Sequence, residues 1–398
     1  MSEEKLVPKL RFSGFTDEWV SYKIGDISKT YSGGTPSTSK REYYEGNIPF
    51  IKSGEIGNEV TEQYINEEAI NNSSAKKVQK GDLLLALYGA TSGEVAISKI
   101  DGAINQAVLK IDNKMNNYFQ YNYFVKYKDQ IIHKYLQGGQ GNLSANIIKK
   151  LEFYYPNLEE QQKISNYLLL IDNKIELLEK KHHEYQNFKK YLMQQIFAQK
   201  LRFADSDSCW KEISLKDIGT FYRGHSYNST NVADEGLLVL RSNNIQGNVL
   251  DFSEDGLQFV DKDCKKELEL QKNDIVICMS NGTRRLVGKS AEYTGNYENK
   301  VTVGAFCSIF RTKNKLAKYL FQTESYKKNL YLILAGTNIN NLKNSDLEKF
   351  KFNIPTNESE INKIHDLFVS IDNKIDYNKK QLEEITLFKK GLLQQMFV

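Results

Sequence analysis

Two spacings of apolar residues alternate along the 398-residue chain and predict two kinds of element. Short apolar runs stand between loops rich in Gly, Asn and Ser, which is typical of strands. We also predict a helix late in each half, over Tyr118–Tyr135 and Lys313–Leu334. Each half therefore begins with an α/β domain built around a small twisted sheet. The strand-like runs are Ile48–Ile51, Leu83–Leu87, Val95–Ile97, Leu237–Leu240 and Ile275–Cys278.

After Pro156 and Pro355 the apolar residues recur every seven positions, which is the core spacing of a coiled coil. No further proline interrupts either stretch before the next domain or the last residue. We predict two long helices, and antiparallel pairing would place equivalent domains at opposite ends of the pair. Asn378 is the polar exception. The core rows are Ile164, Ile171, Leu178, Tyr185 and Leu192, with Leu168, Ile175 and Ile196 beside them, and Ile364, Ile371, Ile385 and Leu392, with Phe368, Ile375, Leu382 and Met396.

The chain is a tandem repeat. Lys9-Leu10-Arg11-Phe12 returns as Lys200-Leu201-Arg202-Phe203, Trp19 returns as Trp210, and Ile171-Asp172-Asn173-Lys174-Ile175 returns unchanged at 371–375. Stretches such as Ser32–Glu45 and Arg223–Glu235 do not repeat. A duplicated scaffold with divergent loops indicates two sites that do the same job on different targets. The fold is then α+β, with α/β domains at 1–157 and 200–357 and long helices at 158–199 and 358–398.

Composition restricts the class of protein further. Apolar residues make up 40% and charged residues 26% of the chain, as in a soluble globular protein. The net charge of +4 is compatible with DNA binding but cannot establish it. All four cysteines lie in the second half and none forms C-x-x-C, which argues against a disulfide frame or zinc site and for a reducing compartment. Without a signal-peptide or membrane-length apolar run, we expect a cytoplasmic protein that does not enter a membrane.

No catalytic constellation can be assembled from the sequence. The five prolines are isolated, so the Pro-Pro-aromatic and Pro-Cys sites of DNA methyltransferases are absent. Gly282–Ser290 has one residue too many for a phosphate-binding loop and carries Thr283 where the first glycine must turn. Glu298-Asn299-Lys300 has no acidic partner of a nuclease site, and the five histidines lack metal-ligand spacing. We therefore predict a binding module without catalytic residues, a bound cofactor or a metal.

In order and in two copies, several motifs make the chain resemble the specificity subunits of type I restriction–modification systems. These are Pro8–Phe12 leading to Trp19, Ser32–Thr38, Ile48–Gly54, Gly138–Leu143 and the helix ends, including Phe388–Phe397. The second copy departs in its loops: Arg223-Gly224-His225-Ser226 lacks Gly-Gly-Thr-Pro, and Ala335–Asn340 replaces Gly-Gly-Gln-Gly-Asn-Leu. We interpret the departure as a different target.

The resemblance implies two target recognition domains, each reading half of a split double-stranded DNA sequence, held apart by two antiparallel helices. It further implies two modification subunits, which bind S-adenosylmethionine and methylate adenine, and restriction subunits, which use ATP and Mg²⁺. No cofactor is expected on this chain itself. The alternatives are a stand-alone, pseudo-dimeric DNA-binding regulator and a complete methyltransferase, the latter disfavoured by the absent motifs.

Base edges are read by Arg or Lys, by Asn or Gln, and by Ser or Thr, so polar residues in Gly-flanked loops are the candidate readers. Such loops are also ordinary turn chemistry, which is the competing interpretation for each residue. Arg241 and the Arg284-Arg285 pair stand out because turns have no need of arginine. The first-domain candidates are Lys52, Ser53, Tyr88, Thr91, Ser92, Gln140 and Asn142. The second-domain candidates are Arg241, Ser242, Asn243, Asn281, Thr283, Arg284, Arg285, Asn338 and Asn340.

Overall fold

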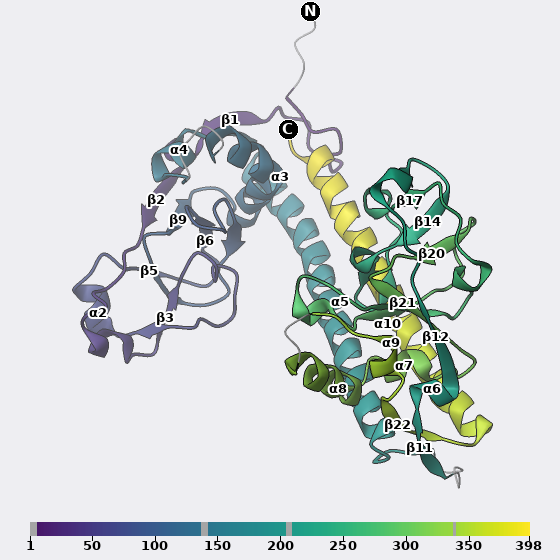
Figure 1. Cartoon of the computed structure of the whole chain (residues 1–398). Coiled ribbons are helices and arrows are strands. Elements are labelled where there is room, and N and C mark those ends of the chain that lie inside the picture. Colours follow the sequence, from purple (N-terminus) through teal and green to yellow (C-terminus); the bar gives the residue numbers. More distant parts are fainter. Residues whose placement is uncertain (1–5, 137–141, 204–208, 337–339) are drawn as a thin grey trace, which may run out of the picture. The chain divides into compact units, whose positions relative to one another are not determined.

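The computed structural model describes residues 6–136, 142–203, 209–336 and 340–398 (Figure 1). The chain forms two compact units, one of Met1–Lys181 with Asn378–Val398 and one of His182–Tyr377. Each unit combines one α/β domain with part of each of two long helices, α5 (Leu158–Phe197) and α10 (Glu358–Met396). The α+β fold with tandem α/β domains and two long helices is confirmed. None of the described helices is long and apolar enough to cross a membrane.

The domain of the first unit contains two four-stranded sheets, where the sequence suggested a single small one. Their strand orders are β2-β9-β6-β7 and β4-β3-β8-β5, and only β3 and β8 pair in parallel. A separate ribbon pairs β1 (Val20–Lys23) with β10 (Glu152–Tyr155). The strands are β2 (Ser28–Ser32), β3 (Ile48–Ile51), β4 (Tyr64–Ile65), β5 (Lys76–Val78), β6 (Leu83–Ala86), β7 (Val95–Ile97), β8 (Gly102–Ile104) and β9 (Val108–Asn113). Short helices are α1 (Ile24–Ile27), α2 (Glu67–Asn71) and α4 (Ala145–Lys150).

The apolar run of β6 is continuous because the strand is buried on both faces. Successive side chains of a strand point to opposite sides. Leu83 and Leu85 join the core that also holds the helix α3 (Asn117–Leu136), whereas Leu84 and Ala86 join a smaller core with Ile51 of the other sheet. The same division recurs in the second unit at β18 (Ile275–Cys278), whose alternate residues belong to two different cores. The central strand of each domain is thus covered on both sides.

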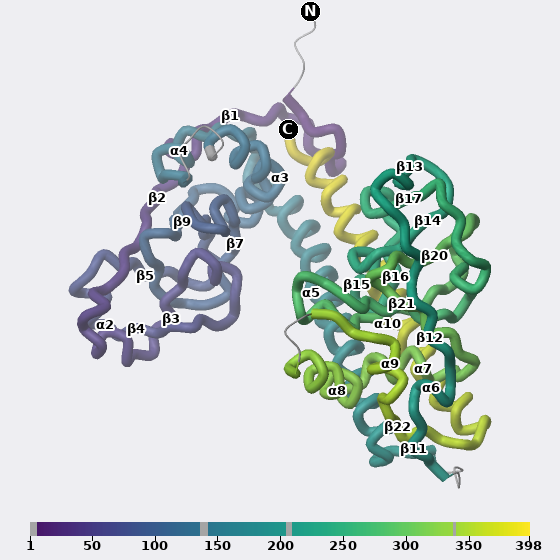
Figure 2. The backbone as a smooth tube through the Cα atoms, in the orientation of Figure 1, coloured from purple at the N-terminus to yellow at the C-terminus, as the bar shows by residue number. Residues whose placement is uncertain are grey.

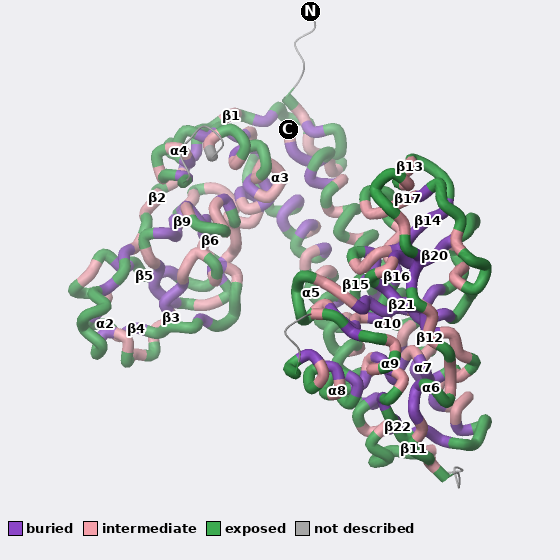
Figure 3. Tube along the Cα trace, viewed as in Figure 1, coloured by how far each residue is buried: buried purple, intermediate pink, exposed green. Residues whose placement is uncertain are grey.

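The second unit repeats this architecture. Its sheets have the orders β12-β21-β18-β19 and β13-β17-β14-β20, with β14 and β20 parallel, and Figure 3 shows both of these strands buried. Figure 2 shows β11 (Trp210–Ser214) beside β22 (Lys351–Pro355), the counterpart of the β1–β10 ribbon. The other strands are β12 (Gly219–Arg223), β13 (Val232–Ala233), β14 (Leu237–Leu240), β15 (Ile245–Gln246), β16 (Val249–Leu250), β17 (Phe259–Val260), β19 (Ser290–Glu292), β20 (Val301–Val303) and β21 (Cys307–Thr312). Short helices are α6 (Leu215–Ile218) and α9 (Asn344–Leu347).

One helix was predicted late in each half of the chain, and only the first of these two predictions is confirmed. Tyr118–Tyr135 corresponds to α3. The single helix predicted over Lys313–Leu334 is wrong, because two helices, α7 (Ala317–Leu320) and α8 (Glu324–Ala335), replace it. The hydroxyl of Thr323 accepts a hydrogen bond from the backbone N–H of Tyr326 at 3.2 Å and caps the start of α8. A threonine that caps a helix stands in extended backbone, which ends the preceding helix.

Within each unit, α5 and α10 pack antiparallel through their seven-residue rows. In the first unit Ile164, Leu168 and Ile171 share a core with Leu392 and Met396, and in the second unit Leu192 and Ile196 share one with Ile364, Phe368 and Ile371. The repeated motifs also meet crosswise. Lys389 pairs with Asp172 at 2.6 Å in the first unit, and Lys189 pairs with Asp372 at 2.6 Å in the second. Each copy of the repeat therefore supplies the aspartate of one ion pair and the lysine of the other.

The repeated Lys-Leu-Arg-Phe motif anchors the start of each long helix. Arg11 donates two hydrogen bonds, both 2.7 Å long, to the carboxylate of Glu160, whose side chain is fully buried in the first turn of α5. Arg202 makes the equivalent bonds to the buried Glu360 of α10, at 3.1 and 3.3 Å, and the indole N–H of Trp210 adds a third bond to Glu360 at 3.2 Å. A buried carboxylate is tolerated only when it is paired and hydrogen-bonded. This repeated motif is therefore structural.

Candidate nucleic-acid interface

The predicted DNA-reading residues of the first domain follow two strands that belong to different sheets. Lys52 and Ser53 follow β3, and Tyr88, Thr91 and Ser92 follow β6. The pairs Ile51–Ile104 and Ala86–Val108 show that the short connection from β8 to β9 reaches both sheets. The loop after β3 and the loop after β6 therefore both begin beside the β8–β9 connection.

Local hydrogen bonds already engage some of these side chains. The Tyr88 hydroxyl donates to the backbone carbonyl of Gln106, which lies in the β8–β9 connection. Ser92 donates to the carbonyl of Leu87 at 2.8 Å, within its own loop. Asn142 is exposed, and the next residue, Leu143, donates its backbone N–H to the carbonyl of Leu87 at 2.8 Å. That bond brings a third predicted loop to the end of β6, whereas Gln140 lies outside the described residues.

The second domain holds its predicted residues at the equivalent strand ends. Arg241 follows β14, and Asn281 lies shortly after β18. Cys278, the last residue of β18, pairs with Cys307, the first residue of β21, so the end of β18 lies where the β20–β21 connection ends. The amide of Asn281 donates to the hydroxyl of Ser242 at 3.1 Å, so these two loops touch. The structure thus brings together residues that are about 40 positions apart in the chain.

Other predicted residues of this domain form a second small group. Arg284, in a helical turn at Arg284–Leu286, donates to the side-chain oxygen of Asn340 at 3.1 Å, and Asn340 donates to the carbonyl of Gly282 at 3.2 Å. Thr283 and Arg285 are exposed. Asn338 lies outside the described residues.

A cavity of about 590 Å³ opens beside Arg241, Ser242 and Asn281. Four predicted residues line it together with aromatic and histidine side chains that the sequence analysis did not select. The exposed aromatic ring of Phe306 is 70% accessible, whereas His225 is only 7% accessible. The lining residues are His225, Tyr227, Arg241, Ser242, Asn243, Ser280, Asn281, Gly282, Gly304, Ala305, Phe306 and Cys307.

The polar groups of this cavity are incompletely satisfied. Nε2 of His225 and Nε of Arg241 are buried and have no hydrogen-bond partner among the described residues. Burial lowers the pKa of His225, and the charge of Lys262 lowers it further, which favours the neutral imidazole. Burial also raises the pKa of Cys307 to about 12, so its thiol stays protonated. Buried polar atoms without partners are unusual in folded proteins and mark places where a ligand can supply the missing bonds.

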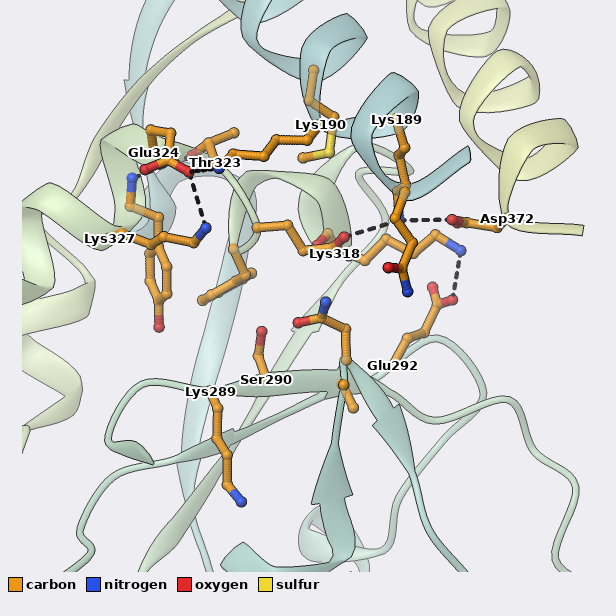
Figure 4. Close-up of a pocket in the computed structure, with 18 of the residues that line it drawn as sticks. Lys189, Lys190, Lys289, Ser290, Glu292, Lys318, Thr323, Glu324, Lys327 and Asp372 are labelled. Atoms are coloured by element: carbon orange, nitrogen blue, oxygen red, sulfur yellow. Dashed lines mark hydrogen bonds and ion pairs between the residues drawn. The ribbon is translucent and has the colours of Figure 1, made fainter. Parts of the chain in front are cut away.

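A larger cavity of about 1160 Å³ lies in the same unit, between the C-terminal half of α5 and the second domain. Its lysines are mostly neutralised: Figure 4 shows Lys189 directed toward Asp372 and Lys318 toward Glu292, pairs of 2.6 and 2.9 Å. Lys327 pairs with Glu324 at 3.0 Å. Paired lysines have little charge left to offer to phosphate groups. Among the described residues, no group of three or more His, Cys, Asp or Glu side chains is placed to hold a metal ion.

Comparison with known proteins places this architecture in a family. The model of the type I restriction modification DNA specificity domain matches the chain twice, over residues 16–186 and 207–387. The chain belongs to the type I restriction–modification specificity family. The two matches coincide with the two copies of the repeat, so the specificity domain of this family includes most of a long helix as well as the α/β part.

Two relatives and one solved structure illustrate the similarity. The specificity subunit of the type I restriction enzyme MjaVIII from Methanocaldococcus jannaschii is 23% identical over 403 residues, covering 95% of this chain and 91% of that protein. The MjaIX specificity subunit from the same organism is 34% identical over 170 residues, covering 40% of this chain and 39% of that protein. The crystal structure of an S subunit from M. genitalium has the same fold, with a TM-score of 0.65, 17% identity and coverage of 98% of this chain and 99% of that one.

Within this specificity-family chain, the residues missed by sequence analysis come from the loops that do not repeat. His225 and Tyr227 belong to the divergent stretch Arg223–Glu235, and Phe306 follows Gly304-Ala305 in the β20–β21 connection. The stretch Arg223–Glu235 differs from the corresponding stretch of the first copy, and this difference could have indicated that His225 and Tyr227 belong to the site. For Phe306 the sequence offered none, because a single aromatic residue next to a strand is ordinarily a core residue.

Proposed function

We propose that this chain is the DNA-reading subunit of a type I restriction–modification complex and that each α/β domain recognises one half of a bipartite target. The observation that carries the proposal is the duplication of one scaffold with different residues at equivalent strand ends. Lys52 follows β3 where Arg241 follows β14, and Tyr88 follows β6 where Ser280 follows β18. Two copies of one scaffold that carry different polar residues in their loops are expected to recognise two different base sequences.

The proposal assigns no chemical step to this chain. Methyl transfer to adenine belongs to two modification subunits that hold S-adenosylmethionine, and cleavage belongs to restriction subunits that use ATP and Mg²⁺. The chain's own contributions are the base-reading side chains and the helix pair that receives the partners.

Exposed apolar side chains on the helices support the docking part of the proposal. In the first unit Leu170 and Leu177, one heptad apart on α5, are 68% and 57% accessible, and Leu387 on α10 is 70% accessible. In the second unit Tyr191 on α5 and Tyr377 on α10 are 56% and 65% accessible. Single exposed apolar residues are common, but repeated ones along a helix pair are typical of protein–protein contact surfaces.

A methylome experiment tests the division of labour. Cells would express the chain with its modification partner, and Ser21–Tyr155 would be exchanged for the equivalent segment of a relative. We expect one half of the methylated sequence to change and the other to stay, because the exchanged segment leaves the second domain intact. The matched control exchanges the second domain and should change the other half. Simultaneous change of both halves, or methylation by this chain without a partner, would refute the proposal.

A further inference from the structure

The turn that joins β20 to β21, residues 304–307, corresponds to the turn that joins β8 to β9, residues 105–108. Each turn is closed by a hydrogen bond from the N–H of its fourth residue to the carbonyl of its first, at 2.8 Å in the second domain and 3.3 Å in the first. The fourth residue of each turn pairs with the last residue of the neighbouring strand, β18 or β6. The two turns therefore correspond residue by residue, and Phe306 stands where the first domain has Ala107.

The side chains at these corresponding positions differ in size and in exposure. Ala107 is 8% exposed, whereas Phe306 is 70% exposed. The carbonyl of Phe306 accepts hydrogen bonds from the N–H groups of Met279 and Ser280, at 2.8 and 3.2 Å, so its backbone is fixed at the end of β18. The ring belongs to none of the hydrophobic cores that the described residues form. A single exposed apolar side chain is ordinary, so its meaning depends on what surrounds it.

Both domains place one aromatic ring at this turn, but from different positions in the chain. In the first domain Tyr88 lies two residues beyond β6, and its hydroxyl donates to the carbonyl of Gln106 in the turn. The second domain has Ser280 at the position of Tyr88 and Phe306 at the position of Ala107. The aromatic and the small residue have thus exchanged places. Because the turn forms equally well with alanine, the ring is not required by its backbone, and we infer a role in the site.

The surroundings of Phe306 suit DNA. The described residues that line the adjoining cavity include no Asp or Glu, and Arg241 contributes a positive charge. Ser242 and Asn281 contribute a hydroxyl and an amide group, both of which can contact base edges. Interfaces with DNA are more polar and much more positively charged than interfaces between proteins. One exposed ring among hydrogen-bonding groups, without a negative charge, is therefore a surface for reading bases.

An apolar ring in such a surface distinguishes thymine from the other bases. Thymine alone carries a methyl group in the major groove, whereas adenine, guanine and cytosine are marked there by hydrogen-bonding groups. Contact between the ring and a methyl group removes apolar surface from water, which is favourable. Against another base the ring would lose this contact or would cover a donor or an acceptor without replacing its bond to water, which costs free energy.

The position of Phe306 suits contact in the groove better than insertion between base pairs. A side chain that wedges two base pairs apart has to enter the stack and therefore project beyond its neighbours. Phe306 instead forms part of the wall of a cavity of about 590 Å³. A hollow beside a ring receives a group that projects from the DNA, and the methyl group of thymine projects from the edge of its base.

We propose, as an extension of the proposed function on which it rests, that Phe306 is a specificity-determining residue of the second half-site and contacts the methyl group of one thymine in the major groove. The polar side chains of the cavity contact the neighbouring base edges. The turn of the first domain makes no equivalent contact, because Ala107 is buried and the hydroxyl of Tyr88 is bonded to the turn itself.

The test uses the full chain assembled with its modification subunits and duplexes that carry the target found by methylome sequencing. Each thymine of the second half-site, on either strand, is replaced in turn by uracil, which lacks only the methyl group. At one position we expect the affinity of the wild-type complex to fall roughly threefold to tenfold. The same replacement should have no effect on Phe306→Ala, whereas Phe306→Leu, which keeps an apolar side chain, should retain part of the difference.

The design remains decisive if a variant misfolds. We expect Phe306→Ala to fold, because the first copy carries alanine at the same position of the same turn. The uracil replacements also test the wild-type complex by itself: insensitivity at every thymine of the second half-site would overturn the inference. Equal sensitivity of the wild type and Phe306→Ala would assign the methyl contact to another residue and would overturn it as well.

Two other roles of the ring predict different results. A wedge between base pairs predicts that Phe306→Ala binds more weakly by the same factor whether thymine or uracil is present. A contact with a partner protein predicts that Phe306→Ala assembles poorly with the modification subunits in the absence of DNA. Either result, without a difference between thymine and uracil that depends on Phe306, would overturn the methyl contact.

Two controls separate this inference from the proposed function. Uracil in the first half-site should affect Phe306→Ala and the wild type equally, because that half-site is read by the other domain. If the wild-type complex showed no sequence-specific binding at all, the proposed function itself would fail. Specific binding of the second half-site in which Phe306 has no part would refute this inference alone.

Discussion

Replacing Asn378 with leucine should stabilise the helix pair. Asn378 is 2% exposed in the core row of α10, and neither Oδ1 nor Nδ2 has a hydrogen-bond partner among the described residues. The first copy of the repeat has Leu178 at the equivalent position, 3% exposed. A buried polar group without a partner costs about 1–3 kcal/mol. We therefore expect Asn378→Leu to raise the free energy of unfolding by about 1–3 kcal/mol.

The assay is thermal unfolding of the full chain at a fixed scan rate. For a unit of roughly 150–250 residues, each kcal/mol shifts the midpoint by about 2–4 °C, so we expect an increase of roughly 2–12 °C. Asn373→Leu is the matched control, because Asn373 is exposed on the same helix and gains the same helix propensity without burial. A variant that melts at or below the wild-type temperature, with the control unchanged, would show that a bound water or another group satisfies Asn378. Since a core asparagine also enforces one pairing register, the variant's mass in solution should be measured alongside.

Three further outcomes follow from individual contacts. Arg241→Ala should relax base discrimination in the second half-site only, by about 1–3 kcal/mol in a methylome-guided binding assay, whereas a uniform loss with a shallower salt dependence would make it a phosphate contact. Lys389→Glu places like charges beside Asp172 and should lower the melting temperature, and adding Asp172→Lys should recover part of the loss; no recovery would mean that the pair is not coupled. Cys209 is exposed, whereas burial raises the pKa of Cys307 to about 12, so at pH 8 a thiol reagent should modify Cys209 rapidly and Cys307 only after unfolding; equal rates would contradict the buried position.

The elements with a strong internal period were predictable from the sequence. The seven-residue rows of α5 and α10 and the apolar runs of β6 and β18 reflect burial that repeats at a fixed spacing, and spacing is visible in a sequence. The second sheet of each domain was not predictable, because strands such as β4, with two residues, are too short to show a period. The break between α7 and α8 depends on the cap at Thr323, a hydroxyl contact that apolar spacing does not reveal.

The candidate site was predictable in part for a related reason. Arg241, Ser242 and Asn281 were selected as polar residues in glycine-flanked loops, and the pairing of the strands brings them to one cavity. His225 was missed because its position depends on a backbone bond to Val303, far along the chain. The sequence also could not show that the hydroxyl of Ser92 donates a hydrogen bond to the carbonyl of Leu87 within its own loop.

The crosswise ion pairs have a consequence for how genes of this kind can change. Because Lys189 binds Asp372 and Lys389 binds Asp172, each of the two copies carries one acidic and one basic residue that are complementary to those of the other copy. A recombination event that exchanges one copy for a homologous copy therefore restores both contacts without any compensating mutation. Between the two copies in this chain, the residues of these ion pairs agree, whereas stretches such as Ser32–Glu45 and Arg223–Glu235 do not. Such a gene can acquire a new DNA target in a single exchange, while natural selection continues to act on one unchanged helix interface.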